Sequence, residues 1–350
     1  MSVLAAGIVL SAMVIDARWG EPRAAWHPVV AIGAYLRAAG RRLPVGPPVR
    51  AWVAGTVAWW LGALVVGALG GALDLGVAWL AHGGGLSLPI GFTWPIVLVA
   101  SPFSVPALAS EPLSAIAGWF GVVGAAIAVV GGAWALKTML AWTMLRDEVL
   151  AVEAALAEDG LDAGRARLSR LVSRDVSTLS AEEIRESAIE SLAENLNDSV
   201  VAPLCWFTCF GFVGACVYRY ANTADAMWGY RGRWEWAGKW AARADDVLSW
   251  VPARLCALAL GGCGRLSDWR RLPAQARLTP SPNGGWPMAA MALLLGVRLG
   301  KPGVYVLNAG ARAPAPADLH RAVAVASAAV RATVFVIMAV MVIWAGVERY

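Results

Sequence analysis

Histidine and paired cysteine are scarce in this chain, and both absences narrow the chemistry open to it. The 350 residues include three His and five Cys, and no two Cys are spaced as C-x-x-C. A zinc site needs several Cys or His ligands and a disulfide framework needs paired Cys, so the sequence favours neither. We expect buried, reduced thiols at Cys205, Cys209, Cys216, Cys256 and Cys263.

Standard nucleotide-binding and repeat signatures are also missing. The chain has no P-loop (G-x-x-x-x-G-K-[ST]), no G-x-G-x-x-G fingerprint and no H-E-x-x-H. No internal repeat of fixed period is evident, which disfavours a transporter built on inverted repeats. The net charge of +5 is spread without a dense basic run that alternates with aromatics. Nucleic-acid binding is therefore not expected.

Charged residues are few, and long apolar runs take their place. Only 15% of the residues are charged and 59% are hydrophobic, whereas soluble domains carry about 25% charged residues. Many of the 19 Trp lie near the ends of apolar runs, where membrane proteins place them. The alternative is a soluble all-helical protein with a large core. We predict an all-α, polytopic membrane protein with about 4–6 transmembrane helices, plus short re-entrant or buried helices.

The expected membrane helices are the apolar runs 2–15, 51–81, 114–136 and 322–347. Six Arg lie within 16–50, whereas 82–111 has no Lys or Arg, so the positive-inside rule predicts that 16–50 is cytoplasmic. The runs 200–217, 251–264 and 287–297 are short or interrupted by Pro. We interpret them as re-entrant or buried helices, because the polar segments between them would then share one cytoplasmic face.

We expect one integral membrane domain over 1–350. Within it, 137–199 is predicted to be a cytoplasmic helical segment. Apolar residues recur there at helical spacing, Gly160 ends one helix, and Ser180 with Glu183 forms a capping box that begins the next. The region 200–300 holds most polar motifs and is the predicted active site.

The strongest candidate for chemistry is an acidic helix face. Glu186, Glu190, Glu194 and Asp198 are four residues apart, which places neighbours about 5–6 Å apart on one face. Such like charges repel unless cations offset them, and oxygen ligands of this kind suit Mg²⁺. The alternative is a solvated acidic face that pairs with arginines.

Further polar clusters follow. Asn222 and Asp225 share a helical face, and Asp245 and Asp246 are adjacent. Carboxylates among arginines at this density indicate phosphate handling, with interfacial salt bridges as the alternative. Ser281-Pro-Asn-Gly-Gly-Trp-Pro predicts a rigid turn before an apolar helix, where backbone N–H groups could meet an anion or simply form a turn.

These motifs, in this order, resemble the adenosylcobinamide-phosphate synthase (cobinamide synthase) family of cobalamin biosynthesis. The stretches that carry the resemblance are Asp16 with Gly20-Glu21-Pro22 and His27-Pro28-Val29; Ser173-Arg174-Asp175; Glu190 to Asn195 with Asp198, Ala202 and Pro203; Tyr218-Arg219 and Asn222-Thr223 with Asp225, Met227, Gly229 and Tyr230; Ala242-Arg243 with Asp245-Asp246 and Pro252 to Arg254; and Ser281-Pro282-Asn283. The chain departs from the family at Ser199, where Gly is common, and at Ala224 and Ala226.

The resemblance implies a multi-pass enzyme of the cell (cytoplasmic) membrane, with its active site facing the cytoplasm. It would be an ATP-dependent acid–amine ligase that joins cobyric acid, or its adenosylated form, to (R)-1-amino-2-propanol or its O-phosphate. Adenosylcobinamide or its phosphate would be the product. ATP and Mg²⁺ are the implied cofactors, and lipid and other cobalamin-pathway enzymes are implied partners.

On this basis we assign candidate roles. The carboxylates that would supply the catalytic base are Glu190, Glu194, Asp198, Asp225, Asp245 and Asp246. Of these, Glu194, Asp198, Asp245 and Asp246 would hold Mg²⁺. The candidates for binding phosphate and substrate are His27, Arg174, Asp175, Asn195, Arg219, Asn222, Arg231, Arg243, Arg254, Ser281 and Asn283. The alternatives are a corrinoid-binding or transport protein, which would show binding without a covalent product, and a scaffold for soluble pathway enzymes.

Overall fold

The computed structural model describes residues 2–23, 27–44, 46–81 and 111–347, and it is helical almost throughout. The elements are α1 (Ser2–Trp19), α2 (Pro28–Arg42), α3 (Pro48–Ala81), α4 (Glu111–Lys137), α5 (Trp142–Glu158), α6 (Leu161–Leu168), α7 (Ala181–Leu196), the π-helical turn η2 (Asn197–Val201), α8 (Ala202–Trp228), α9 (Lys239–Leu248), α10 (Trp250–Gly264), α11 (Leu272–Ala276), α12 (Gly285–Leu295), a hairpin of β1 (Leu299–Lys301) and β2 (Tyr305–Leu307), and α13 (Pro316–Val347). The predicted all-α class is confirmed.

Four helical stretches among the described residues are long and apolar enough to cross a membrane: Pro48–Ala81, Gly121–Glu158, Ala181–Trp228 and Pro316–Val347. The pair α9 and α10, bent by 46°, would make a fifth. The expected helices at 51–81, 114–136 and 322–347 are therefore confirmed. The run at 2–15 forms the first part of α1 and is helical, but α1 is not among these four stretches. The predicted external segment 82–111 lies almost wholly outside the described residues.

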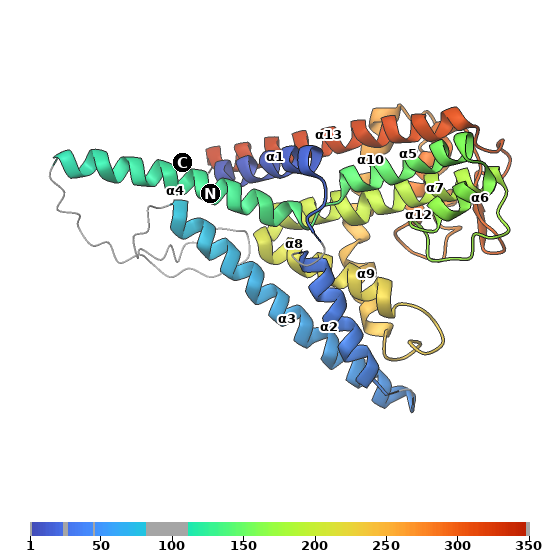
Figure 1. The fold of residues 1–350 in the computed structure, drawn as a ribbon, viewed down its shortest axis with the longest axis horizontal. Coiled ribbons are helices and arrows are strands. Elements are labelled where there is room, and N and C mark those ends of the chain that lie inside the picture. The colour runs from blue at the N-terminus through green and yellow to red at the C-terminus, as the bar shows by residue number, and fades with distance from the viewer. Residues whose placement is uncertain (1, 24–26, 45, 82–110, 348–350) are drawn as a thin grey trace.

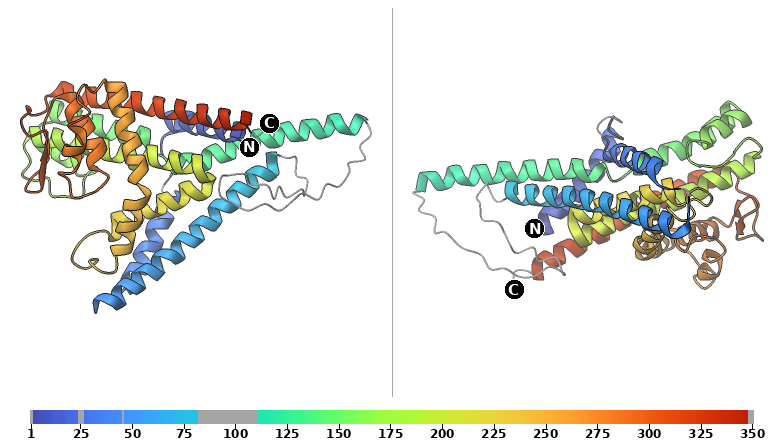
Figure 2. Two further views of the ribbon diagram at one scale, coloured as in Figure 1. Left: turned by 180° about the vertical axis from the view of Figure 1, so that it is seen from behind. Right: turned by 90° about the horizontal axis from the view of Figure 1, so that it is seen from below.

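The helices form a long row that includes α1, α4 and α13, from which α2 and α3 slant away (Figure 1). Figure 1 shows α1 and α13 side by side along one edge, and α1 also packs along α4. Helix α3 packs along α8, an arrangement that Figure 2 shows from below. Helices α5, α6, α7 and α12 gather at the end opposite the start of α4 (Figure 1). The long acidic helix α7 therefore runs from this end into the apolar body.

Local sequence signals explain the boundaries of the polar helices. Ser180 Oγ accepts a hydrogen bond from the Glu183 N–H, and the Glu183 carboxylate accepts one from the Ser180 N–H. This reciprocal pair is the predicted capping box. Gly160 has a φ of 90°, which favours glycine, and it separates α5 from α6. Val149 and Val152 of α5 are fully buried, as their helical spacing predicts.

The chain continues through Pro203 without a break, contrary to the interruption expected there. Proline lacks an N–H and so leaves the carbonyl four residues earlier without a helical partner. That carbonyl belongs to Ser199, and it accepts a hydrogen bond of 3.1 Å from the Ala141 N–H. The π-helical turn η2 lies directly before Pro203 and accommodates it. The Ser199 carbonyl thus anchors the junction between α4 and α5 to the π-helical turn η2.

Helix α8 bends instead at Gly211, where φ is +60°. The bend leaves the backbone N–H groups of the next residues without helical partners. The Asp74 carboxylate of α3 accepts hydrogen bonds from the N–H groups of Phe212 at 3.0 Å and Val213 at 3.3 Å. A carboxylate in an apolar helix is costly unless it is hydrogen-bonded. Asp74 therefore serves as an N-terminal cap for the second half of α8.

All five cysteines are free thiols, but the expectation that all are buried is wrong. Cys209 and Cys263 are exposed, Cys205 is half-buried, and Cys216 and Cys256 are buried. Cys209 precedes the bend in α8 and Cys263 lies in the last turn of α10, where both helices present an outer face. In a polytopic helical protein, outer apolar faces are free to contact lipid.

Candidate functional site

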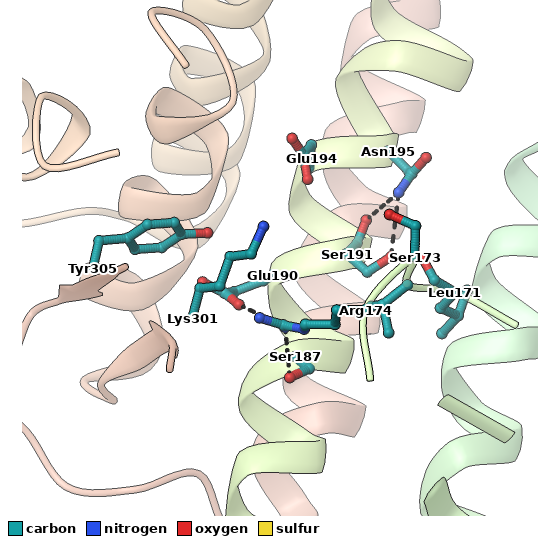
Figure 3. Close-up of a pocket in the computed structure, with 11 residues that line it drawn as sticks. Leu171, Ser173, Arg174, Ser187, Glu190, Ser191, Glu194, Asn195, Lys301 and Tyr305 are labelled. Carbon is teal, nitrogen blue, oxygen red and sulfur yellow. Dashed lines mark hydrogen bonds and ion pairs between the residues drawn. The ribbon is translucent and has the colours of Figure 1, made fainter. Parts of the chain in front are cut away.

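A polar cavity of about 150 Å³ lies between α7, the preceding loop and the β-hairpin (Figure 3). The charged and polar residues that line it are Ser173, Arg174, Ser187, Glu190, Ser191, Glu194, Asn195, Lys301 and Tyr305. Four predicted site residues therefore meet here: Arg174, Glu190, Glu194 and Asn195. They meet because α7 presents its residues 187, 190, 191 and 194 on one face, as the helical spacing predicts.

Arg174 reaches the acidic face from the loop before α7. Its Nη2 donates to Ser187 Oγ at 2.7 Å and to Glu190 Oε2 at 3.3 Å. Its Nε and Nη1 are buried and have no hydrogen-bond partner among the described residues, and neither has Glu190 Oε1. Unpaired buried polar atoms are costly, so they mark a place where a ligand or water would bind. The alternative prediction, that arginines pair with the acidic face, therefore holds for one oxygen of Glu190. Oε2 is paired with Arg174, and Oε1 is not.

Two cavity residues were not found by sequence reasoning. Lys301 ends β1 and Tyr305 begins β2; the Lys301 side chain passes Glu190 with its ammonium on the side of Glu194, and Tyr305 lies beside it (Figure 3). Burial and the neighbouring Glu190 carboxylate raise the pKa of the Tyr305 hydroxyl well above its usual value, so it stays protonated and can donate. Neither residue lies in a local motif, because their position depends on a tertiary contact with a helix more than a hundred residues earlier.

A second polar group surrounds the π-helical turn. Asp198 accepts hydrogen bonds from Asn197 Nδ2 at 2.8 Å and from Asn222 Nδ2 at 3.2 Å. The same Asn222 amide lies 3.4 Å from Asp245 Oδ1. Asn222 therefore bridges two predicted carboxylates that are far apart in the sequence. A π-helical turn often marks a functional site, since it reorients side chains within an otherwise regular helix.

Arg219 packs against this turn from α8. Its Nη1 donates to Ser199 Oγ at 3.2 Å and lies 3.4 Å from the Asp198 carbonyl oxygen, whereas its Nε is buried without a partner among the described residues. Ser199 is the position at which the family pattern commonly has Gly. The serine hydroxyl gives Arg219 an acceptor that glycine would not provide.

The two groups are electrostatically continuous. Glu194 lies within Coulombic reach of Glu190, Asp198, Asp225 and Lys301. A Cβ built on Gly284 would lie 2.9 Å from Glu194 Oε1, so the glycine permits the start of α12 to approach this carboxylate closely. Asp225 and Asp246 also interact through their charges. The polar cavity and the polar group around η2 therefore form one continuous region, which we call the seam. It contains all six predicted carboxylates.

Arg254 is held as a structural anchor within this seam. Its Nη1 donates to Asn283 Oδ1 at 2.8 Å and to the Trp250 carbonyl at 2.7 Å, and Nη2 donates to the Pro282 carbonyl at 3.2 Å. Its guanidinium lies 4.2 Å and 4.7 Å from the rings of Trp250 and Trp286. These contacts occupy much of the donor capacity of the arginine. The geometry favours a role in holding the turn before α12.

The predicted turn at Ser281 is present and is linked to α9. Ser281 Oγ accepts hydrogen bonds from the N–H groups of Asn283 at 3.2 Å and Gly284 at 3.1 Å. Asn283 Nδ2 donates to the Asp246 carbonyl at 2.7 Å. The Ser281 hydroxyl already accepts from both N–H groups, which fixes the turn. Through Asn283, the turn holds the backbone at Asp246 in place.

Besides His27, three predicted binding residues are not drawn into the seam. Arg231 and Arg243 are exposed. Asp175 is exposed too, and its Oδ1 accepts a hydrogen bond from the Ser177 N–H at 2.9 Å, which lowers the pKa of the carboxyl. This local turn leads the loop back to the capping box of α7, so Asp175 shapes the loop that carries Arg174.

The N-terminal motif residues form a buried ionic group. Lys137 Nζ lies 2.8 Å from Glu21 Oε1 and 3.5 Å from Asp16 Oδ1, and its side chain has no exposure. His27 Nε2 lies 3.0 Å from Glu21 Oε2, and its Nδ1 accepts from the Val29 N–H as the cap of α2. Burial opposes ionisation of Glu21, but hydrogen bonds from His27 and Lys137 outweigh it and lower its pKa. His27 is thus a cap and an ion-pair partner, and Lys137 was missed because it looked like the end of a membrane helix.

The carboxylates do not form a ready-made metal cage. Within the described part of the chain, no group of three or more His, Cys, Asp or Glu side chains is arranged to hold a metal ion. Mg²⁺ in phosphoryl-transfer sites is usually bound by one or two carboxylates, with substrate phosphates and water as the other ligands. The Asp198 and Asp245 pair bridged by Asn222 fits that smaller requirement.

Comparison with known proteins gives one consistent result. A family model described as CobD/Cbib protein matches residues 9–334. The chain is 39% identical over 223 residues to "Cobalamin biosynthesis protein CobD" of Dehalococcoides mccartyi, which covers 62% of this chain and 71% of that one. It is 36% identical over 305 residues to the protein of that name from Stutzerimonas stutzeri, covering 85% and 82%.

An archaeal relative, "Probable cobalamin biosynthesis protein CobD" of Thermococcus kodakarensis, is 46% identical over 178 residues. That match covers 49% of this chain and 57% of the relative, so it spans less than two thirds of the relative's length. No solved structure gives a significant match. Since the family model covers nearly the whole chain, from residue 9 to residue 334, the chain belongs to the CobD/Cbib protein family.

Proposed function

We propose that this protein acts in cobalamin biosynthesis and catalyses ATP-dependent amide formation. The acid would be cobyric acid or its adenosylated form, and the amine would be (R)-1-amino-2-propanol or its O-phosphate. Membership of the family and the names of the relatives support the pathway. The observation that carries the chemistry is the continuous seam in which Glu190, Glu194 and Asp198 face the cations Arg174, Lys301 and Arg219.

The reaction needs such a mixed seam. A free carboxylate is a poor acyl donor, because its charge and its poor leaving group resist attack by an amine. Transfer of the terminal phosphoryl group of ATP to the carboxylate gives an acyl phosphate and ADP. Attack by the neutral amine then forms the amide and releases inorganic phosphate. Cations must stabilise the transferring phosphoryl group, and a base must take the ammonium proton.

The residues divide naturally between these tasks. Arg174 and Arg219 have unpaired guanidinium nitrogens for phosphate oxygens, and Arg219 is fixed at Ser199. Asp198 and Asp245, bridged by Asn222, would hold Mg²⁺, which would neutralise polyphosphate charge. Glu194 is exposed at the cavity and lies near Lys301, so it can reach a bound substrate, and we assign it as the base.

We place the seam on the cytoplasmic side of the cell membrane. ATP is available there, and the basic segment 16–50 is predicted to lie there too. Soluble enzymes of the pathway and membrane lipid would be its other partners.

The proposal is tested by product formation with the purified protein in nanodiscs. We expect amide product, seen by mass spectrometry, only when adenosylcobyric acid, ATP, Mg²⁺ and the amine are all present. Corrinoid binding without product under every combination of amine and corrinoid would contradict the ligase and favour a binding or transport protein.

A further inference from the structure

We propose that Arg174 and Lys301 together bind a phosphate group in the cavity between α7 and the β-hairpin. The inference rests on the proposed function in one respect: the phosphate is expected to belong to one of that reaction's substrates. It assigns a role to the hairpin 299–307, which lies in no motif that carries the family resemblance.

Arg174 supplies the first half of the site. One nitrogen, Nη2, is fixed by Ser187 and Glu190, while Nε and Nη1 are buried without a partner among the described residues. Each of these two nitrogens keeps a charged N–H donor in the plane of the guanidinium, and a phosphate oxygen is a strong acceptor for such a donor. The guanidinium is thus oriented by the protein before any ligand binds.

Lys301 supplies the second half from the opposite wall. Figure 3 shows its side chain extending from the hairpin over Glu190, with its ammonium group on the side of Glu194. Within the parts of the chain that the structure describes, Lys301 forms no ion pair, although it lies within Coulombic reach of Glu194. Its ammonium is therefore available to a ligand. Two cations on opposite walls can contact one phosphate from two sides.

The carboxylates of the cavity restrict the ligand further. Glu190 and Glu194 balance the charges of Arg174 and Lys301, so a bare dianion would meet repulsion as well as attraction. A phosphate that carries its own cation avoids this conflict. Its phosphate would face Arg174 and Lys301, and its cation would face Glu194. Tyr305 lines the same cavity, and burial together with the charge of Glu190 keeps its hydroxyl protonated.

Two substrates have this chemistry. One is a phosphorylated amino alcohol, whose ammonium is the cation. The other is the terminal phosphate of ATP with bound Mg²⁺. Both present a terminal phosphate beside a positive charge, and this is the chemistry that the cavity fits. Binding measurements distinguish which of the two molecules carries the bound phosphate.

The test uses the full chain in nanodiscs and measures dissociation constants by calorimetry. The probes are aminopropanol phosphate, aminopropanol, and a non-hydrolysable ATP analogue with Mg²⁺. The variants are Lys301→Met and Lys301→Arg. The matched control is Lys239→Met, since Lys239 lies over the ring of Trp236 and away from the cavity.

We expect Lys301→Met to weaken binding of one phosphate probe about tenfold or more, the size expected for loss of a charged hydrogen bond. Lys301→Arg should restore most of it, and Lys239→Met should have no effect. Weakening confined to aminopropanol phosphate would identify the amine as the source, and weakening confined to the analogue would identify ATP. In either case aminopropanol binding should not change.

The inference is overturned if Lys301→Met leaves the binding of both phosphate probes unchanged, or if the wild-type protein binds neither. Its failure is separable from failure of the proposed function. Amide formation with unchanged phosphate binding in Lys301→Met would reject the site but keep the ligase. Phosphate binding that depends on Lys301, without amide product, would keep the site but reject the ligase.

Discussion

Lys137 and Glu21 form an ion pair of 2.8 Å in which the lysine side chain has no exposure to solvent. Lys137 ends α4, and Glu21 follows α1 in the loop that leads to α2. Asp16, which is also buried, lies 3.5 Å from the same ammonium and accepts a hydrogen bond from the Thr143 N–H at 2.9 Å. This one lysine therefore ties the N-terminal motif to the junction that Ser199 anchors from the other side.

Replacing Lys137 by Met should destabilise the protein strongly. The change leaves two buried carboxylates without their cation, and loss of one partner from a buried pair costs about 3–5 kcal/mol. We expect a clear fall in the melting temperature in detergent, whereas Lys239→Met should change it little. An unchanged melting temperature for Lys137→Met would show that the buried ion pair does not stabilise the fold.

Glu21 should make stability depend on pH in a defined direction. Its pKa in the folded protein lies below the usual value of 4.5, so the folded state binds fewer protons than the unfolded state near that pH. The stabilisation is therefore complete above about pH 4.5 and is lost as the pH falls through the lower, folded-state pKa. Denaturation followed from pH 7 downwards should show a steeper loss for wild type than for Glu21→Gln. Parallel profiles would contradict the assigned shift.

Substitutions in the carboxylate seam should remove turnover without unfolding the protein. We expect Glu194→Gln and Asp245→Asn each to lower kcat by about 10² or more, because the first removes the proposed base and the second removes a proposed Mg²⁺ ligand. Asp147→Asn is the control, because Asp147 is exposed on α5 and, within the described residues, forms an ion pair with its neighbour Arg146 alone. Full turnover by both seam variants, with normal melting temperatures, would mean that the catalytic groups lie elsewhere.

Arg254→Lys should loosen the turn before α12. Lysine cannot reproduce the planar contacts with Asn283, the Pro282 carbonyl and the two tryptophan rings. Hydrogen exchange at residues 281–286 should become faster than in wild type, and Arg277→Lys, at an exposed position, should leave it unchanged. Equal exchange in all three proteins would argue against Arg254 as the anchor of the turn.

The cytoplasmic placement can be tested by labelling. Glu235 is exposed between α8 and α9, so a Cys at this position should react with a membrane-impermeant maleimide. The background should replace the exposed Cys209 and Cys263 with Ala. We expect labelling in inverted vesicles and not in intact cells. Labelling from outside only would place the loop, and with it the seam, on the other side of the membrane.

Much of the helical framework follows from sequence, because long apolar runs and caps are local signals. The capping box at Ser180, the end of α5 before Gly160 and the shared face of Glu190 and Glu194 are all local properties. The course of the chain at Pro203 is not, because the Ser199 carbonyl that proline leaves without a helical partner accepts a hydrogen bond from the distant Ala141 N–H. No sequence pattern near Pro203 predicts that Ala141 is the hydrogen-bond partner.

The site residues likewise fall into those that local sequence predicts and those that tertiary packing places. The spacing of acids on α7 is visible in the sequence, whereas Lys301 and Tyr305 reach it through the packing of a distant hairpin. The motif around Arg254 predicts a phosphate-binding arginine. In the structure, its guanidinium instead contacts Trp250, Trp286 and Asn283. Residue type and motif identify which side chains matter, and only tertiary contacts show which of them are free.

The most direct test of the proposed ligase follows oxygen from the acid substrate. Adenosylcobyric acid carrying ¹⁸O in its free carboxylate would be incubated with the protein, ATP, Mg²⁺ and the amine, and the inorganic phosphate would be analysed by mass spectrometry. Because an acyl phosphate retains one carboxylate oxygen in its bridge, we predict one ¹⁸O in each phosphate released with the amide. Amide product with unlabelled phosphate would contradict the account.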